Sequence, residues 1–278
     1  MSSSTPNKGL GCRQAVDGNM TAEHEFRLQQ SRQFASRLLS ARLSMREATS
    51  MLTSRILPRI TYSMPVTTFS PDQCRRLNTA IDQVMLNKLN VHRNMPKAVL
   101  YSPLKWGGLN YPSFQVIQDQ KGLLYMLQQL RWNGTVANDM LVVLSGVQLM
   151  SGMVTPIFEN TDVKLDYIPC GWFSHQHGRL REMKATIWIK HQWSPQTQRD
   201  NDKSIMEEFQ KIAGITRAKL NKANWCRIYA RVITLSDLTT IRGNTIPGQR
   251  LWGTWRAESP LSWPDTKRPP DNYWRTLR

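Results

Sequence analysis

The chain has 278 residues, of which 40% are hydrophobic, so it can form one large folded domain or two smaller ones. Its 37 Lys and Arg residues against 20 Asp and Glu residues give a net charge of +17 and an isoelectric point near 10.2. Such an excess favours a polyanionic partner, with nucleic acid ahead of an acidic membrane surface.

Cysteine usage and hydropathy argue against a secreted or membrane protein. The four cysteines, Cys12, Cys74, Cys170 and Cys226, form no CxxC pair and are too few for a disulfide framework in a chain of this length. The first residues lack the apolar core of a secretory signal, and no stretch approaches the roughly 20 apolar residues of a membrane span. We therefore expect an intracellular protein, in the nucleus or the cytoplasm.

Turn and capping signals predict helices through the N-terminal half. Residues 9–19 indicate a short strand followed by a turn at Asp17-Gly18. Pro58 is expected to bend or end the second helix. The residues expected to cap successive helices are Thr21, Ser44 (with Glu47 in a capping box), Ser70 (before Pro71) and Ser113.

The C-terminal half is also expected to be mainly helical. Residues 156–178 and the Pro- and Trp-rich tail, 260–278, predict irregular structure, and residues 241–246 predict a tight hairpin around Gly243. A domain boundary is expected near residues 150–175. The helices are expected over 137–150, 180–192, 203–213 and 217–232.

Two clusters could hold a metal, but each has a simpler explanation. Cys170, His175, His177 and His191 lack the paired spacing of structural zinc sites, which favours a turn with solvent-facing histidines. Asp200, Asp202, Glu207 and Glu208 could support two-metal phosphoryl chemistry.

The favoured interpretation of the acidic cluster is structural. Asp202 is placed to cap a short helix, and the glutamates would lie in its first half, where the helix dipole stabilises them. No P-loop, Rossmann glycine pattern, GxSxG or HExxH motif occurs, so motifs do not support an enzyme complete within this chain.

Cations alternate with large aromatic rings at 131–132, 188–190, 250–256 and 263–278. Such surfaces suit phosphate contact combined with base stacking. The alternative is that the tryptophans lie in the core and the arginines cover them with their aliphatic stems.

Several segments, taken in order, resemble one family. Residues 9–18, Gly-Leu-Gly-Cys-Arg-Gln-Ala-Val-Asp-Gly, resemble the stretch just after the polymerase palm in reverse transcriptases of non-LTR retrotransposons. In that family a Leu-Gly strand and a turn precede a long helix rich in Arg and Gln. Residues 26–42 of this chain resemble that helix. Residues 57–69, Cys74, 90–96 and 101–109 resemble the thumb region, and 224–229, 235–237 and 262–264 are similar to the region after the thumb in one branch of these elements.

The resemblance implies a mainly α fold. Residues 1–20 would be the end of a palm-like strand and turn, 21–150 a thumb-like helical bundle, and 170–278 a mainly helical region with a small hairpin and an irregular tail. The family's catalysis needs an adjacent Asp-Asp pair in the palm, and this chain contains none. No catalytic residue is therefore carried over, and we expect the chain to be inactive alone, with magnesium needed only by the complete polymerase.

The expected function is to grip a primer–template duplex by its backbone. The partners would be RNA, DNA or an RNA–DNA hybrid, and the palm upstream in the same element. Three alternatives stay open: an independent basic helical module, a metal-dependent nuclease using Asp200, Asp202 and Glu207, and a decayed reading frame. The candidate phosphate contacts are Arg27, Arg37, Arg42, Arg93, Lys97, Lys105 and Arg131.

The connector, residues 96–110, joins two expected helices and carries part of this candidate site. Pro96 and Pro103 would stiffen it, and Gly107-Gly108 would let the chain turn sharply. Tyr101 and Trp106 would pack between the helices and leave the neighbouring cations free to meet phosphates. The alternative is a plain loop with a hydrophobic plug.

Overall fold

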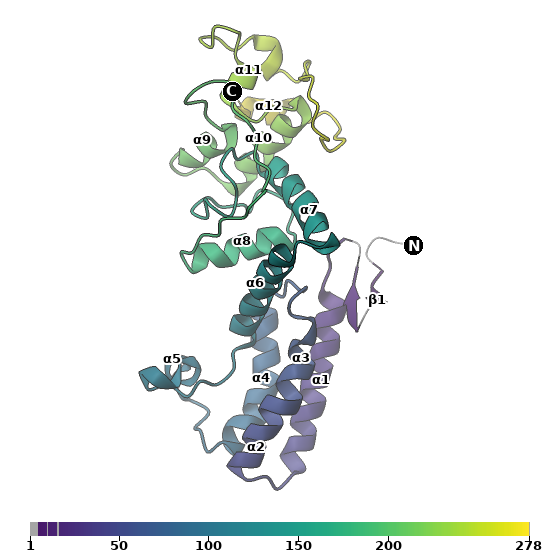
Figure 1. Cartoon of the computed structure of the whole chain (residues 1–278), viewed down its shortest axis with the longest axis vertical. Coiled ribbons are helices and arrows are strands. Elements are labelled where there is room, and N and C mark those ends of the chain that lie inside the picture. Colours follow the sequence, from purple (N-terminus) through teal and green to yellow (C-terminus); the bar gives the residue numbers. More distant parts are fainter. Residues whose placement is uncertain (1–4, 10, 16, 278) are drawn as a thin grey trace. The chain divides into compact units, whose positions relative to one another are not determined.

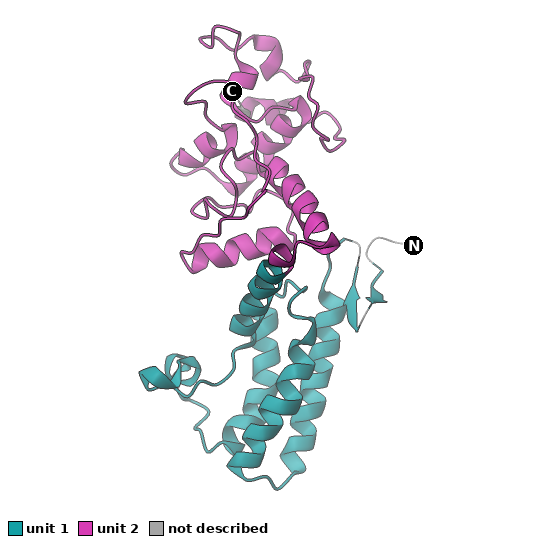
Figure 2. Cartoon of the chain, in the orientation of Figure 1, with its two compact units in different colours: residues 1–128 teal, residues 129–278 magenta. Residues whose placement is uncertain are grey.

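The computed structural model describes residues 5–9, 11–15 and 17–277 (Figure 1). It confirms the expected fold class, a mainly helical protein with a short two-stranded sheet at its N-terminal end. The chain divides into two compact units, Met1–Gln128 and Gln129–Arg278, called unit 1 and unit 2 below (Figure 2).

Unit 1 begins with a hairpin and a long helix. Strand β1 (Asn7–Gly9) pairs antiparallel with β2 (Cys12–Gln14), and α1 (Thr21–Ser40) follows. The cap of α1 is not the expected one: the N-cap position falls on Met20, whose side chain makes no capping bond. The side-chain oxygen of Asn19 accepts from the backbone N–H of Thr21 at 2.9 Å instead.

Pro58 does not end its helix, because the helical stretch continues past it to Ile60. The stretch runs through α2 (Met45–Met51), the π-helix η1 (Leu52–Ile56) and α3 (Leu57–Ile60), and it starts with the expected capping box of Ser44 and Glu47. The N–H of Leu57 donates to the carbonyl of Leu52, five residues back. The wider π turn just before the proline accommodates a residue that lacks an N–H.

The rest of unit 1 packs around the pair α1 and α4. Ser70 caps α4 through a capping box with Gln73, as expected, and Pro71 is its first residue. The side chain of Gln118 ties α6 to the segment before α4, because it both donates to and accepts from the backbone of Phe69. The remaining elements are the 3-10 turn η2 (Thr61–Ser63), α4 (Pro71–Lys88), α5 (Lys97–Tyr101), the 3-10 turn η3 (Leu104–Trp106) and α6 (Phe114–Trp132).

One apolar core holds these helices together. Its fully buried side chains come from α2, η1, α3, α4 and the segment between η2 and α4, and its partly buried ones include Phe34 of α1. Burying a large aliphatic side chain stabilises a fold by about 1.5–3 kcal/mol, so this cluster is the main source of unit 1 stability. The fully buried members are led by Ile56, Ile60, Met64, Phe69, Leu77, Ile81 and Met85.

Unit 2 is a second helical cluster with its own core. Helices α10 and α12 pack together, and Trp274 of α12 is 1% exposed among residues such as Ala223 and Cys226. Its elements are α7 (Thr135–Ser151), α8 (Trp172–Glu182), α9 (Ile205–Lys211), α10 (Arg217–Ala230), α11 (Leu235–Leu238), the 3-10 turn η4 (Gly248–Leu251) and α12 (Asp271–Leu277).

Three expectations for unit 2 differ from the structure. Helix α8 begins at Trp172, inside the segment 156–178 that was expected to be irregular. It ends at Glu182, although a helix was expected over residues 180–192. Lys184, with φ 51°, turns the chain out of the helix. The tail contains α12, and residues 241–246 form a turn without strands, closed by the N–H of Thr240 donating to the carbonyl of Thr245 at 2.9 Å.

The division between the units falls before the expected boundary at 150–175. Helix α7 belongs to unit 2 because the side chains of Asn224 and Arg227 hydrogen-bond to carbonyls in its last turn. These contacts link residues more than 70 positions apart, so no local pattern announces them.

Candidate nucleic-acid interface

Three acidic side chains of unit 1 have partners within the unit. Glu23 is fully buried, and its Oε1 accepts from Nε of Arg27 at 2.6 Å. Glu47 is used in the capping box at the start of α2. Asp72 pairs with Arg75 at 2.9 Å.

Many cations of unit 1 have no carboxylate in ion-pair contact within the part of the chain that the structure describes. Among the residues that the structure describes, the exposed cations of this unit with no carboxylate in ion-pair contact are Lys8, Arg32, Arg37, Arg42, Arg46, Arg55, Arg59, Arg76, Arg93, Lys97 and Lys105. A surface of this kind attracts phosphate over a distance of about one Debye length, roughly 8–10 Å at physiological salt.

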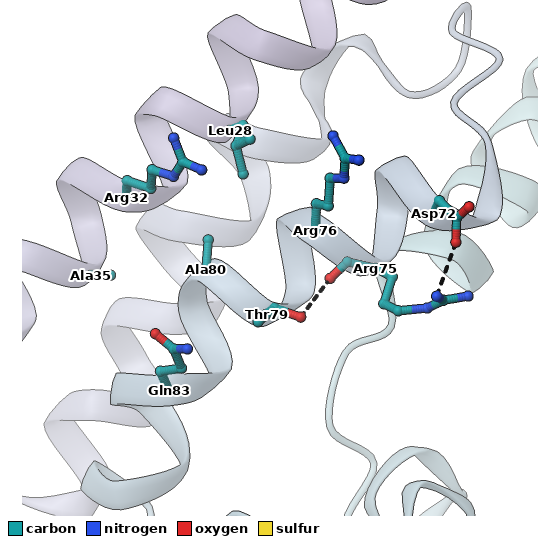
Figure 3. Close-up of a pocket in the computed structure, with 9 residues that line it drawn as sticks. All are labelled: Leu28, Arg32, Ala35, Asp72, Arg75, Arg76, Thr79, Ala80 and Gln83. Atoms are coloured by element: carbon teal, nitrogen blue, oxygen red, sulfur yellow. Dashed lines mark hydrogen bonds and ion pairs between the residues drawn. The ribbon is translucent and has the colours of Figure 1, made fainter.

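Two of these cations face the same groove. The α1–α4 groove is lined by Leu28, Arg32, Ala35, Asp72, Arg75, Arg76, Thr79, Ala80 and Gln83. Figure 3 shows Arg32 reaching in from α1 and Arg76 from α4, while Arg75 turns back to the carboxylate of Asp72. Apart from Asp72, which is paired with Arg75, the rest of the wall is uncharged and contains no aromatic ring: Leu28, Ala35, Thr79, Ala80 and Gln83.

Arg27, one of the seven expected phosphate contacts, is a structural residue. It is 4% exposed, and besides Glu23 it donates to the carbonyls of Gly11 and Arg59 at 3.1 and 2.9 Å. It thereby ties the hairpin and α3 to α1, and it cannot meet a phosphate. The signal was present in the sequence, because Glu23 precedes Arg27 by four residues, the spacing of a helical ion pair.

Arg37 and Arg42 are exposed near the C-terminal end of α1, without a carboxylate partner among the described residues. Arg37 lies in the last turn of the helix, where a cation is also favoured by the helix dipole. Arg131 is exposed as well, but it follows Gln128 and so belongs to unit 2. Of the seven expected residues, five are exposed cations of unit 1, whereas Arg27 is buried in that unit and Arg131 lies in unit 2.

Backbone hydrogen bonds join the two ends of the connector. The carbonyls of Val99, Leu100 and Ser102 accept from the backbone N–H groups of residues 109, 111 and 110, at 2.8–2.9 Å. Gly108 lies so close to the carbonyl of Ser102 that a Cβ there would be 2.1 Å from the oxygen. Glycine is therefore required by close approach at this position.

Trp106 does not pack between the helices as expected, because it is 73% exposed. Gly107, with φ 76°, ends the turn η3 in a left-handed conformation that leaves residues 104–106 on the outside. Nζ of Lys105 lies 4.4 Å from the ring centroid of Trp106. Tyr101 does pack, with its ring centroid 6.4 Å from that of Tyr111.

The three cations of the connector region, Arg93, Lys97 and Lys105, are all exposed. Burial raises the pKa of the Asp82 carboxyl in α4 to about 6, while the Tyr111 hydroxyl and the charge of Lys97 act in the opposite direction. Lys97 thus interacts with a carboxyl of α4 as well as facing solvent.

The two suspected metal clusters are not assembled. Within the described parts of the chain no group of three or more His, Cys, Asp or Glu side chains is placed to hold a metal ion. Asp202 does not cap α9, which Ser204 caps by accepting from the N–H of Glu207 at 3.1 Å. Instead Oδ1 of Asp202 accepts from the backbone of Ser236 at 3.1 Å.

The histidines of α8 do not face solvent as expected. His177 is 1% exposed and His175 is half-buried. Burial lowers the pKa of both imidazoles, that of His175 to about 4, so both are neutral at physiological pH.

Some of the tryptophans that neighbour cations are exposed, and others are buried in the core. Trp132 and Trp188 are exposed, as a stacking role requires. Trp274 is buried in the core of unit 2, and the guanidinium of Arg250, 4.5 Å from the ring of Trp255, is committed to the carbonyls of Asp237 and Thr239.

Comparison of the chain with family models, with curated proteins and with solved structures finds no match. None of the described helices combines the length and the apolar character needed to cross a membrane. The chemistry of this surface is therefore the basis for assigning a function.

Proposed function

We propose that unit 1 binds nucleic acid through the sugar–phosphate backbone, with little sequence preference. One observation carries the proposal: unit 1 exposes a set of cations that have no carboxylate in ion-pair contact among the described residues. Most of these cations are arginines, whose planar guanidinium fork matches the geometry of a phosphate. Contacts to the backbone fix position and carry no base code.

We further propose that this binding serves a reverse transcriptase of the non-LTR retrotransposon type. Unit 1 would be the thumb-like part that grips the primer–template duplex, RNA, DNA or hybrid, beside a palm encoded upstream. Magnesium and the catalytic aspartates would belong to that palm. The resemblance of residues 9–109 supports this assignment, which implies a protein that works inside the cell, in the nucleus or the cytoplasm.

The salt dependence of binding tests the backbone proposal. For duplex DNA the logarithm of the affinity falls with the logarithm of salt concentration, by a slope of about 0.9 for each phosphate neutralised. Replacing both Arg32 and Arg76 by Ala should reduce the slope by up to about 1.8. Replacing the three connector cations Arg93, Lys97 and Lys105 by Ala should reduce it by up to about 2.7.

The matched control is Gln83→Ala, which alters the α1–α4 groove without changing its charge and should leave the slope as in the wild type. Fluorescence anisotropy with labelled duplexes of two unrelated sequences gives both the slope and the sequence preference. A salt-independent wild-type affinity would refute backbone binding.

The coding sequence upstream of Met1 tests the polymerase proposal separately. An in-frame palm with an adjacent pair of aspartates, transcribed together with this segment, supports the thumb role. An interrupted reading frame would exclude the thumb role. The chain would then be an independent nucleic-acid-binding module, whose affinity would have the same dependence on salt.

A further inference from the structure

Unit 1 has a second groove on another side of α1, and this one contains aromatic rings. The groove has a volume of about 780 Å³ and lies between α1 and the helical stretch from α2 to α3, with residues of the hairpin at one end. Its lining includes four cations, Lys8, Arg27, Arg55 and Arg59, and three rings, Phe26, Phe34 and Tyr62. We call it the aromatic groove.

The charge of the aromatic groove is entirely positive. No Asp or Glu is among its lining residues, and the only lining cation that pairs with a carboxylate is Arg27, through Glu23. Lys8, Arg55 and Arg59 are exposed and have no carboxylate in ion-pair contact among the described residues. An anionic ligand therefore meets no repulsion from the lining side chains.

Tyr62 gives this groove a stacking surface. Its side chain is 59% exposed, which is high for a large ring in a folded unit. The hairpin lies against one edge of the ring, since a Cβ on Gly11 would be 3.2 Å from Cε1 of Tyr62. Phe34, which also lines the groove, is half-buried, with the guanidinium of Arg59 5.9 Å from its ring centroid.

We propose that the aromatic groove binds a single-stranded segment of nucleic acid. A base stacks on Tyr62 while Lys8, Arg55 and Arg59 contact the flanking phosphates. This inference rests on the proposed function and adds a preference that the α1–α4 groove lacks, because that groove has no ring. Bases in a duplex are stacked on each other, whereas those of a single strand are free to stack on a protein ring.

An abasic strand separates stacking from charge, since it keeps every phosphate and lacks the bases. The stacking of one base contributes about 1–3 kcal/mol, which corresponds to about 5- to 150-fold in affinity. The full chain should therefore bind a labelled oligothymidine at least about fivefold more tightly than an abasic strand of equal length. Fluorescence anisotropy at one fixed salt concentration measures both affinities.

The variant Tyr62→Leu should abolish this preference and bind the two strands equally, while Tyr62→Phe, which keeps the ring, should retain it. Trp106→Leu is the matched control, because it removes an even more exposed ring elsewhere in unit 1. Duplex affinity should be the same in all three variants.

Three results would overturn the inference. Equal wild-type affinity for the two strands would show that the rings make no contribution, with backbone binding intact. A preference that survives in Tyr62→Leu, or that is lost in Trp106→Leu, would place the stacking elsewhere. Failure to bind strand and duplex alike would refute the proposed function itself.

Discussion

Arg227 offers the most direct test of how unit 2 is held together. Arg227 is 0% exposed, and among the carboxylates that the structure describes none is in ion-pair contact with it. Nε donates to Oδ1 of Asn224 at 2.9 Å, and the terminal nitrogens donate to the carbonyls of Leu149, Met150 and Val232 at 2.9–3.1 Å. Leu149 and Met150 lie in the last turn of α7, where unpaired carbonyls carry partial negative charge.

The substitution Arg227→Met keeps an unbranched side chain and removes every donor. It leaves Leu149, Val232 and Asn224 each with an acceptor that loses its partner, while the carbonyl of Met150 keeps the amide of Asn224 at 3.1 Å. A buried acceptor without a partner costs about 1–3 kcal/mol, and costs that share one network are not additive.

The loss of the cation also removes a penalty. Burial lowers the pKa of Arg227 to about 10, so its charged form, which persists at neutral pH, is held in the fold at a cost. Setting this relief against three orphaned acceptors, we expect Arg227→Met to destabilise unit 2 by about 3 kcal/mol.

Urea unfolding followed by tryptophan fluorescence measures this change, because every tryptophan except Trp106 lies in unit 2. Arg227→Lys should fall between Met and the wild type, since an ammonium cannot reproduce the guanidinium fork. Arg217→Ala, at an exposed position on the same helix, should change the free energy of unfolding by less than about 0.5 kcal/mol. A loss below about 1 kcal/mol in Arg227→Met would refute the reasoning.

Two further predictions concern the connector and the Asp82 carboxyl of α4. Gly108→Ala should destabilise unit 1 by about 2 kcal/mol, because its Cβ would be 2.1 Å from the carbonyl oxygen of Ser102. Thermal melting measures this change. The control Gly146→Ala, at a position with open space around it, should not destabilise the protein. Burial raises the pKa of Asp82 to about 6 from 3.8, so the folded state binds the proton more tightly and stability should fall by up to about 3 kcal/mol as pH rises from about 4 to 6. In Asp82→Asn the free energy of unfolding, measured by urea unfolding followed by circular dichroism, should no longer fall between about pH 4 and 6. If the variant keeps the pH dependence of the wild type, Asp82 is not the group that titrates.

The sequence predicted what local chemistry decides. The helix starts at Ser44 and Ser70 are confirmed, because a capping box depends only on residues three positions apart. The start of α8 at Trp172 was missed, because the segment before it carries no comparable side-chain cap: the N-cap there is Gly171.

The candidate site was predicted less well, because burial depends on distant contacts. Arg27 and Arg37 lie on the same helix, yet only Arg27 is buried. Its pairing with Glu23 follows from their four-residue spacing, but the carbonyls of Gly11 and Arg59 that complete its contacts are not revealed by a helical period. For Trp106 the hydrophobicity of the ring predicted burial. In the structure Trp106 is exposed, next to Gly107 in the left-handed conformation.

The two grooves of unit 1 share α1 as a wall, and helical geometry keeps their chemistry apart. Arg32 and Phe34 are two residues apart, so they point about 200° from each other around the helix axis, one into each groove. A single helix can therefore present bare guanidinium to a duplex on one side and an aromatic ring to a single strand on the other. An end where duplex gives way to single strand offers both ligands at once, and binding across α1 would favour such a junction over either ligand alone.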